Sequence, residues 1–216
     1  MAEEIFDVVD EHDRVVGRET RGEVHRRGLM HRAIHVLVFN SRGEVFLQKR
    51  SMKKDRQPGL WDSSASGHVE CGEDYDTSAI RELREEIGLN PPAAPQKLFK
   101  LPASGATDQE HVWVYHCDAD GPFVLHPDEI DQGEWFAPAA VTERINNKPD
   151  DFALPRDSNE RLSAGLALPD HNLDLLLSFF SIQPYRNFRS DLFQGIQNVS
   201  FIVATGLTIF SLFGFL

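Results

Sequence analysis

A run of glutamates between Gly67 and Leu89 constrains this chain more than any other segment, and it reads GHVECGEDYDTSAIRELREEIGL. Residues three and four positions apart share one face of a helix, so Glu82, Glu85 and Glu86 are expected to form one acidic stripe. Adjacent carboxylates repel one another unless cations neutralise them. Mg²⁺ prefers oxygen ligands and is commonly held by one or two carboxylates together with waters and substrate phosphates. The stripe therefore predicts a platform for metal and phosphate.

The same segment carries the signals of a short helix with one buried face. Apolar side chains recur at helical spacing, and we expect them to pack on a core and to hold the glutamates outward. These apolar residues are Ala79, Ile80, Leu83 and Ile87. Residues able to cap the helix N-terminus are Asp74, Asp76, Thr77 and Ser78. Gly88 fits a left-handed helix end, so the helix should be short and bounded by loops.

Glutamate-rich helices are commonly just solvated surfaces, and for the helix alone that interpretation is the simpler one. The complete pattern is more specific, since it reads G-x5-E-x7-R-E-U-x-E-E-x-G-U, where U is aliphatic. A random window matches such a pattern on the order of once in a billion. The pattern is the Nudix box, and the chain resembles a Nudix protein.

This resemblance implies a fold and a set of roles. Nudix proteins fold as an α/β/α sandwich around a mixed sheet, within the α/β or α+β class, and they use Mg²⁺ or Mn²⁺. The metal ligands implied are Glu82, Glu85, Glu86 and the carbonyl of Gly67, with Arg81 orienting the carboxylates and Glu73 stabilising the loop. Metal ions on a diphosphate neutralise its charge and lower the pKa of an attacking water.

Composition is consistent with a small soluble enzyme. The 216 residues, 41% of them hydrophobic, suit one domain over residues 1–154 and an extension over residues 155–216. The formal net charge of -12 argues against binding along a nucleic-acid backbone, so no nucleic-acid partner is expected. Only Cys71 and Cys117 are present, too few for a disulfide scaffold, and the acidic N-terminus lacks the features of a secretory signal. We expect a cytoplasmic protein.

Hydrophobic patterns along the chain predict strands separated by turns. The expected strands or extended segments are residues 5–9, 15–18, 34–39, 44–50, 61–64, 67–70, 98–101, 111–117, 122–125 and 133–136. A second helix is expected over residues 141–146. Strands mixed with few helices favour a layered sandwich over an all-β barrel.

A finer resemblance, from about residue 6 to residue 140, is to the isopentenyl-diphosphate isomerase branch of the same superfamily. It rests on the segment HRRGLMHRAIHVLVFNSRGEVFLQKRSMKKDRQPGLWDSSASGHV. The resemblance implies a divalent-metal site at His25, His31, His68 and Glu110, with Asp108 as a further acidic ligand. Imidazoles favour Mn²⁺ or Zn²⁺ over Mg²⁺. The spacing from His25 to His31 is one residue shorter than in that branch, and the alternative is that these histidines bond the backbone or face solvent.

Basic residues recur where that branch grips a diphosphate. The matching positions are Arg21, Arg50 and Lys54, and we expect the phosphate contact chiefly from the latter two. The alternative is a basic loop screened by water.

Ser66 is the main departure from the isomerase branch, which carries a catalytic Cys at this position. A hydroxyl has too high a pKa to exchange protons with carbon as a thiol does. A small-molecule diphosphate hydrolase is therefore the leading prediction, with an isomerase or a non-catalytic binding module as alternatives. Glu110 could serve as a base for the attacking water, as a metal ligand, or as both.

The substrate stays open between a nucleoside diphosphate linked to another group and a small organic or prenyl diphosphate. Trp61, Trp113 and Trp135 could line a pocket, although tryptophans beside strands usually fill the core.

An apolar run, VSFIVATGLTIFSLFGFL, occupies residues 199–216. As a helix it would extend roughly 27 Å, near the hydrocarbon thickness of a bilayer. We consider a membrane anchor or a segment that packs on the domain. Residues 173–182 are too short to span and are expected to form an amphipathic packing helix.

Overall fold

Nine strands and three α-helices make up residues 3–153, the part of the chain that the computed structural model describes. The strands are β1 (Ile5–Val9), β2 (Val15–Thr20), β3 (His31–Phe39), β4 (Val45–Arg50), β5 (Trp61–Asp62), β6 (Ala65–His68), β7 (Gln96–Leu101), β8 (Glu110–Asp118) and β9 (Ile130–Phe136). The helices are α1 (Arg21–Arg27), α2 (Tyr75–Ile87) and α3 (Pro138–Asn147), and a 3-10 turn follows at Pro149–Asp151.

The main sheet is mixed. Its strands run in the order β5-β4-β3-β8-β7, with β6 beside β3 and β9 beside β4. The pairing of β3 with β8 is parallel, whereas the other pairings are antiparallel. The two halves of β3 have different partners on the same side: residues 33–36 pair with β6, and Val38 and Phe39 pair with β4. This division leaves β6 free to lead directly into the box loop and α2.

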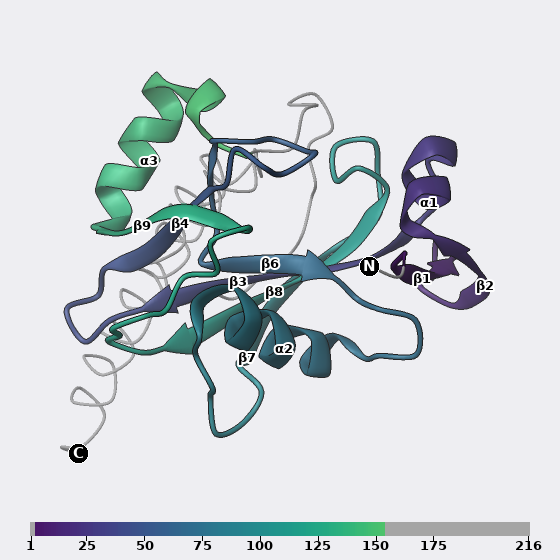
Figure 1. Cartoon of the computed structure of the whole chain (residues 1–216), viewed down its shortest axis with the longest axis horizontal. Coiled ribbons are helices and arrows are strands. Elements are labelled where there is room, and N and C mark those ends of the chain that lie inside the picture. Colours follow the sequence, from purple (N-terminus) through teal and green to yellow (C-terminus); the bar gives the residue numbers. More distant parts are fainter. Residues whose placement is uncertain (1–2, 154–216) are drawn as a thin grey trace, which may run out of the picture.

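Alternate side chains of the sheet fill two separate core layers. One layer contains Leu37, Val114 and the α3 residues Val141 and Ile145. The other layer contains side chains from the opposite face of β3 and β8 together with those of α2. Figure 1 shows α2 and α3 on opposite sides of the sheet, with α1 and the β1–β2 hairpin together at one end. The predicted α/β/α sandwich around a mixed sheet is confirmed.

The predicted outward orientation of the box glutamates holds for Glu85 but was wrong for Glu82 and Glu86. Glu82 and Glu86 are buried, 9% and 3% exposed, whereas Ile80, expected on the core face, is only partly buried. Positions 79, 82, 83, 86 and 87 follow one three-and-four spacing and together form the face that α2 turns to the sheet. The Glu82 and Glu86 carboxylates therefore lie at the margin of the core, and of the three glutamates only Glu85 is exposed.

One further prediction about local structure was wrong, and one helix was not predicted. Residues 122–125 are not a strand, because Pro122 lacks an N–H and the segment instead caps α2. The backbone N–H of Val124 donates to the carbonyl of Ile87, and that of His126 donates to the carbonyl of Glu86. Helix α1 was not predicted, although Thr20 accepts a hydrogen bond from the N–H of Glu23 and so caps its N-terminus.

The predictions for the C-terminal region lie outside the described residues. These are the extension over residues 155–216, the amphipathic helix over residues 173–182 and the apolar run over residues 199–216. In the part of the chain that the structure covers, none of the helices combines the length and the apolar character needed to span a bilayer.

Candidate functional site: a carboxylate helix and a histidine cluster

Helix α2 is fixed at both ends by its own sequence. The Asp74 side chain accepts a hydrogen bond from the N–H of Thr77 at 2.8 Å, so Asp74 is the N-cap among the predicted candidates. Gly88 ends the helix in the left-handed conformation, with φ of 70°, as predicted. These caps place the box glutamates beside β6.

Arg81 lies at the centre of the acidic side chains. Its guanidinium donates to Glu73 at 3.1 Å, to Glu82 at 2.8 Å and to Glu85 at 3.2 Å. It also donates to the carbonyl of His68 at 2.9 Å, which ties the helix to the end of β6. Arg81 and Glu73 therefore occupy positions from which they can orient the carboxylates and hold the loop.

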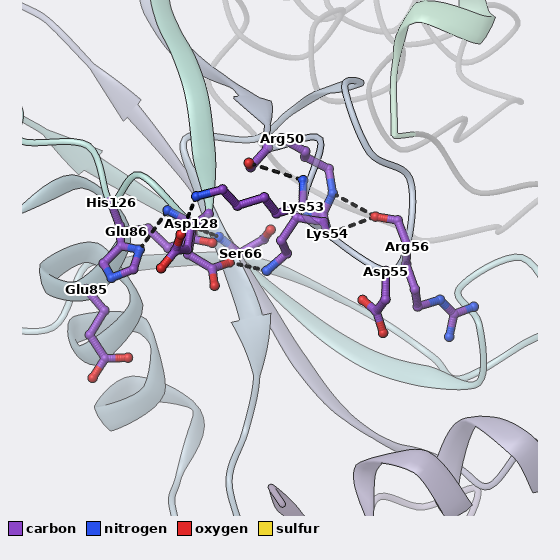
Figure 2. A network of polar contacts seen from close by, with 12 residues as sticks. Arg50, Lys53, Lys54, Asp55, Arg56, Ser66, Glu85, Glu86, His126 and Asp128 are labelled. Atoms are coloured by element: carbon purple, nitrogen blue, oxygen red, sulfur yellow. Dashed lines mark hydrogen bonds and ion pairs between the residues drawn. The ribbon is translucent and has the colours of Figure 1, made fainter. Parts of the chain in front are cut away.

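Glu86 is held by two donors from the sheet. Its Oε2 accepts from the Gln48 amide and from the backbone N–H of Ser66, each at 2.9 Å. The Glu85 side chain is half exposed and points away from Glu86 (Figure 2). Gly67 makes room for Glu82, because a Cβ at this position would lie 2.0 Å from the Glu82 Oε1. Glu82 and Glu86 therefore lie directly against β6, and Glu85 is joined to Glu82 through Arg81.

The buried carboxylates lack sufficient positive charge. Burial raises the pKa of Glu82 to about 7, and burial together with the neighbouring Glu82 carboxylate raises the pKa of Glu86 well above its ordinary value. A buried negative charge is costly unless it is paired or binds a metal. The carboxylate oxygens of Glu82 and Glu86, buried close together, fit a hard divalent cation such as Mg²⁺ or Mn²⁺.

The raised pKa of Glu82 predicts a pH-dependent stability difference. Between pH 4.5 and about 7 the folded state binds more protons at Glu82 than the unfolded state, so this group lowers stability as pH rises. In the absence of metal, the free energy of unfolding of the wild type should therefore fall relative to that of the Glu82→Gln variant as pH rises. The difference between the two should grow by about 3 kcal/mol from pH 4 to pH 8.

Denaturant unfolding at the two pH values measures this difference. Mg²⁺ should narrow the gap at pH 8, because the cation relieves the repulsion in the wild type. A gap that does not change with pH would contradict the assignment of a perturbed carboxyl to Glu82.

The second group of functional side chains is a histidine cluster formed by His25, His31 and His68. One nitrogen from each ring lies within 4.8 Å of the others. Glu110 joins them, since its Oε1 is 3.5 Å from the His31 Nε2 and 3.2 Å from the His68 Nε2. The three rings and the carboxylate come from α1, β3, β6 and β8.

Hydrogen bonding in the cluster fits a metal ion. The His31 Nδ1 lies 2.9 Å from the carbonyl of Leu29, so Nδ1 carries the proton and Nε2 keeps its lone pair. The Nε2 atoms of His25 and His31 are buried without a hydrogen-bond partner among the described residues. Burial opposes ionisation of Glu110, but the hydrogen bond from His68 and the nearby His31 ring outweigh it and hold the pKa of Glu110 well below the usual range.

The loop before β8 adds Asp108 to this cluster. The Asp108 Oδ2 is 3.4 Å from the His25 Nδ1. Asp108 and Gln109 both have positive φ, 55° and 65°, a conformation that is costly for residues other than glycine. This backbone turns the acidic side chain toward His25.

Of the predicted phosphate anchors, Lys54 lies near enough to Glu86 for its charge to act on that carboxylate, and Arg50 is connected to Ser66 through Asp62. The Arg50 Nη1 is 3.0 Å from the Asp62 carboxylate, and Lys54 forms a hydrogen bond with Glu129. Figure 2 shows Lys53 and Lys54 directed toward the end of α2 that carries Glu86. Arg21 instead pairs with Asp55 at 2.7 Å, on the far side of the β4–β5 loop.

Several polar residues of the site carried no sequence signal. Asp62 is 3% exposed and accepts from Arg50 and from the hydroxyl of Ser66, at 3.0 and 3.3 Å. Gln48 and Arg56 were also not predicted. The only local hint of Asp62 was that it begins the polar run after Trp61. Trp61 is buried in the core, whereas Trp113 and Trp135 are partly buried beside the α2 layer.

Comparisons with known proteins match the part of the chain that carries these site residues. The NUDIX domain family matches residues 29–156, which include α2 and every member of the histidine cluster except His25. An uncharacterized Nudix hydrolase of Yersinia pestis is 35% identical over 146 residues, covering 66% of this chain and 78% of that protein.

Two other relatives are informative. Isopentenyl-diphosphate Delta-isomerase 2 of Photorhabdus laumondii is 31% identical over 155 residues, covering 70% of this chain and 88% of that protein. The crystal structure of DR0079 from Deinococcus radiodurans is similar with a TM-score of 0.63 and 25% identity, covering 82% of this chain and 99% of that one.

Proposed function

Because this chain belongs to the Nudix family, we propose that it is a metal-dependent hydrolase that cleaves the diphosphate linkage of a small molecule. The resemblance to Nudix proteins, drawn from the sequence, is confirmed by these relatives, and the isomerase from Photorhabdus laumondii is consistent with the finer resemblance to the isomerase branch. The observation that carries the proposal is the pair of buried carboxylates, Glu82 and Glu86, held against β6: Glu82 shares its only cation, Arg81, with Glu73 and Glu85, and Glu86 has no ion pair among the described residues.

In this proposal the residues of the box hold the metal. Glu82 and Glu86 supply carboxylate oxygens, Glu85 and the carbonyl of Gly67 complete the set, and Arg81 keeps the carboxylates in place. When bound, Mg²⁺ or Mn²⁺ would neutralise the diphosphate and lower the pKa of an attacking water. Arg50, at the end of β4, and Lys54, on the loop that follows, would hold phosphate oxygens in line for that attack.

For Glu110 the hydrogen bonds favour one of its alternative roles. A carboxylate that accepts a hydrogen bond from His68 and whose pKa is held well below the usual range is a poor base at neutral pH. We therefore assign Glu110 to the histidine cluster as a ligand, and the chemistry of three imidazoles and a carboxylate fits Zn²⁺ or Mn²⁺.

The isomerase remains a second candidate because the histidine cluster and one relative favour it. Against it stands Ser66, whose hydroxyl donates to Asp62 at 3.3 Å and whose chemistry differs from that of a thiol. The substrate is proposed to be either a nucleoside diphosphate linked to a second group or a small organic or prenyl diphosphate.

One panel of substrates separates the candidates. Nucleotide and isoprenoid diphosphates are incubated with the full chain and Mg²⁺ or Mn²⁺, and the products are identified by mass spectrometry. We expect metal-dependent release of phosphate or of a monophosphate. Conversion of isopentenyl into dimethylallyl diphosphate without phosphate release would favour the isomerase, and binding without turnover would favour a binding module.

A further inference from the structure

Arg56 lies against the histidine cluster from outside. Its Nη1 is 2.5 Å from the Asp108 Oδ2 and 2.7 Å from the His25 Nδ1. Arg56 belongs to the loop between β4 and β5, far in sequence from both partners. In Figure 2 its side chain lies at the opposite end of this loop from Lys53 and points away from Glu86. The guanidinium therefore serves the histidine cluster and not the carboxylates of α2.

The short contact with His25 determines which ring nitrogen carries the proton. An arginine can only donate hydrogen bonds, so the His25 Nδ1 must accept and cannot itself carry a hydrogen. A neutral imidazole has one N–H, which must then be on Nε2. That Nε2 is buried among the cluster and has no acceptor within the described residues. In this arrangement His25 presents a hydrogen, and not a lone pair, to the other two histidines.

Asp108 offers His25 the opposite arrangement. Its Oδ2 lies 3.4 Å from the His25 Nδ1 and could accept a hydrogen from that atom if Arg56 moved away. The ring proton would then move from Nε2 to Nδ1 by exchange with water. Histidines that bind metals commonly donate their second N–H to a carboxylate, which fixes the ring in the form with a free lone pair. Arg56 and Asp108 thus favour two alternative states of the same ring.

We propose that Arg56 is a positioning residue that holds His25 in the form unable to bind metal, and that metal binding at the histidine cluster requires Asp108 to replace Arg56 at the His25 Nδ1. This inference rests on the proposed metal site formed by His25, His31, His68 and Glu110. It accounts for the costly backbone conformation before β8, which places Asp108 beside His25.

Zn²⁺ titration of the full chain by calorimetry tests the proposal without measuring activity. The Arg56→Met variant keeps the aliphatic stem but has no donor, and it should bind Zn²⁺ about tenfold more tightly than the wild type. The Asp108→Asn variant removes the carboxylate and should bind about 10- to 100-fold more weakly. Lys53→Ala is the matched control, since it removes one positive charge from the same loop without touching His25, and its affinity should equal that of the wild type.

The nitrogen chemical shifts of the His25 ring provide an independent measurement. In the metal-free wild type the proton should be on Nε2, and in metal-free Arg56→Met it should be on Nδ1. A wild-type ring already protonated on Nδ1, unchanged Zn²⁺ affinity in Arg56→Met, or no Zn²⁺ binding at all would each overturn the proposal. Mg²⁺-dependent hydrolysis is measured separately, so its success alongside any of these results would leave the proposed function standing.

Discussion

Replacing Glu86 by Gln is expected to lower turnover about a thousandfold while the fold stays intact. The change is nearly isosteric, and the remaining side-chain oxygen can still accept from Gln48 and from the N–H of Ser66. What is lost is the negative charge that holds the metal against the diphosphate, a contribution of about 4 kcal/mol to the transition state. Because the charge is buried, its removal should not lower stability.

Steady-state kinetics at saturating Mg²⁺, with thermal unfolding as the measure of the fold, check this expectation. Glu143→Gln is the matched control, since Glu143 is an exposed glutamate on α3 and lies on the opposite side of the sheet from α2. Its turnover should equal that of the wild type. A Glu86→Gln variant within tenfold of wild-type turnover would show that this carboxylate does not hold the catalytic metal.

The Gly67→Ala variant should lose activity about a hundredfold through displacement of Glu82. An added Cβ would lie 2.0 Å from the Glu82 Oε1 and 2.3 Å from its Cδ, so the carboxylate must move. Displacements of about 1 Å in a catalytic arrangement commonly cost about a hundredfold in rate. The concentration of Mg²⁺ needed for half-maximal rate should rise as well, because one ligand is out of place.

Gly17→Ala provides the control for an alanine in a strand. Its added Cβ would meet only the Val8 Cβ, at 4.0 Å, which is ordinary contact. Wild-type turnover and Mg²⁺ dependence in Gly67→Ala would mean that the position of Glu82 beside β6 is not needed for catalysis.

The parts of the site formed by local sequence were the most predictable. The caps of α2 follow from the residue types at its two ends, Asp74 and Gly88. That Glu82, Glu85 and Glu86 lie near one another along the helix follows from their spacing. Their burial does not, because hydrophobicity assigns the core face to apolar residues only. The space for Glu82 is created by Gly67 on another element, and the partners of Glu86 come from β4 and β6.

The histidine cluster shows what spacing cannot supply. His25, His31, His68 and Glu110 lie on four elements, and the sequence placed them together only through the family resemblance. Arg56 was missed because a basic loop normally faces solvent, and nothing local marks one of its charges as reaching another loop. Helix α1 was missed despite a recognisable signal, the capping-box spacing from Thr20 to Glu23.

The central claim is that this protein directs a metal-activated water at phosphorus in a diphosphate bridge, using the carboxylates of α2. Turnover in ¹⁸O-labelled water, followed by mass spectrometry of the products, tests that claim most directly. One ¹⁸O atom should enter a phosphoryl product per cleavage, and the Glu86→Gln variant should incorporate almost none. Turnover without label in any phosphoryl product, or equal incorporation by the variant, would contradict the account.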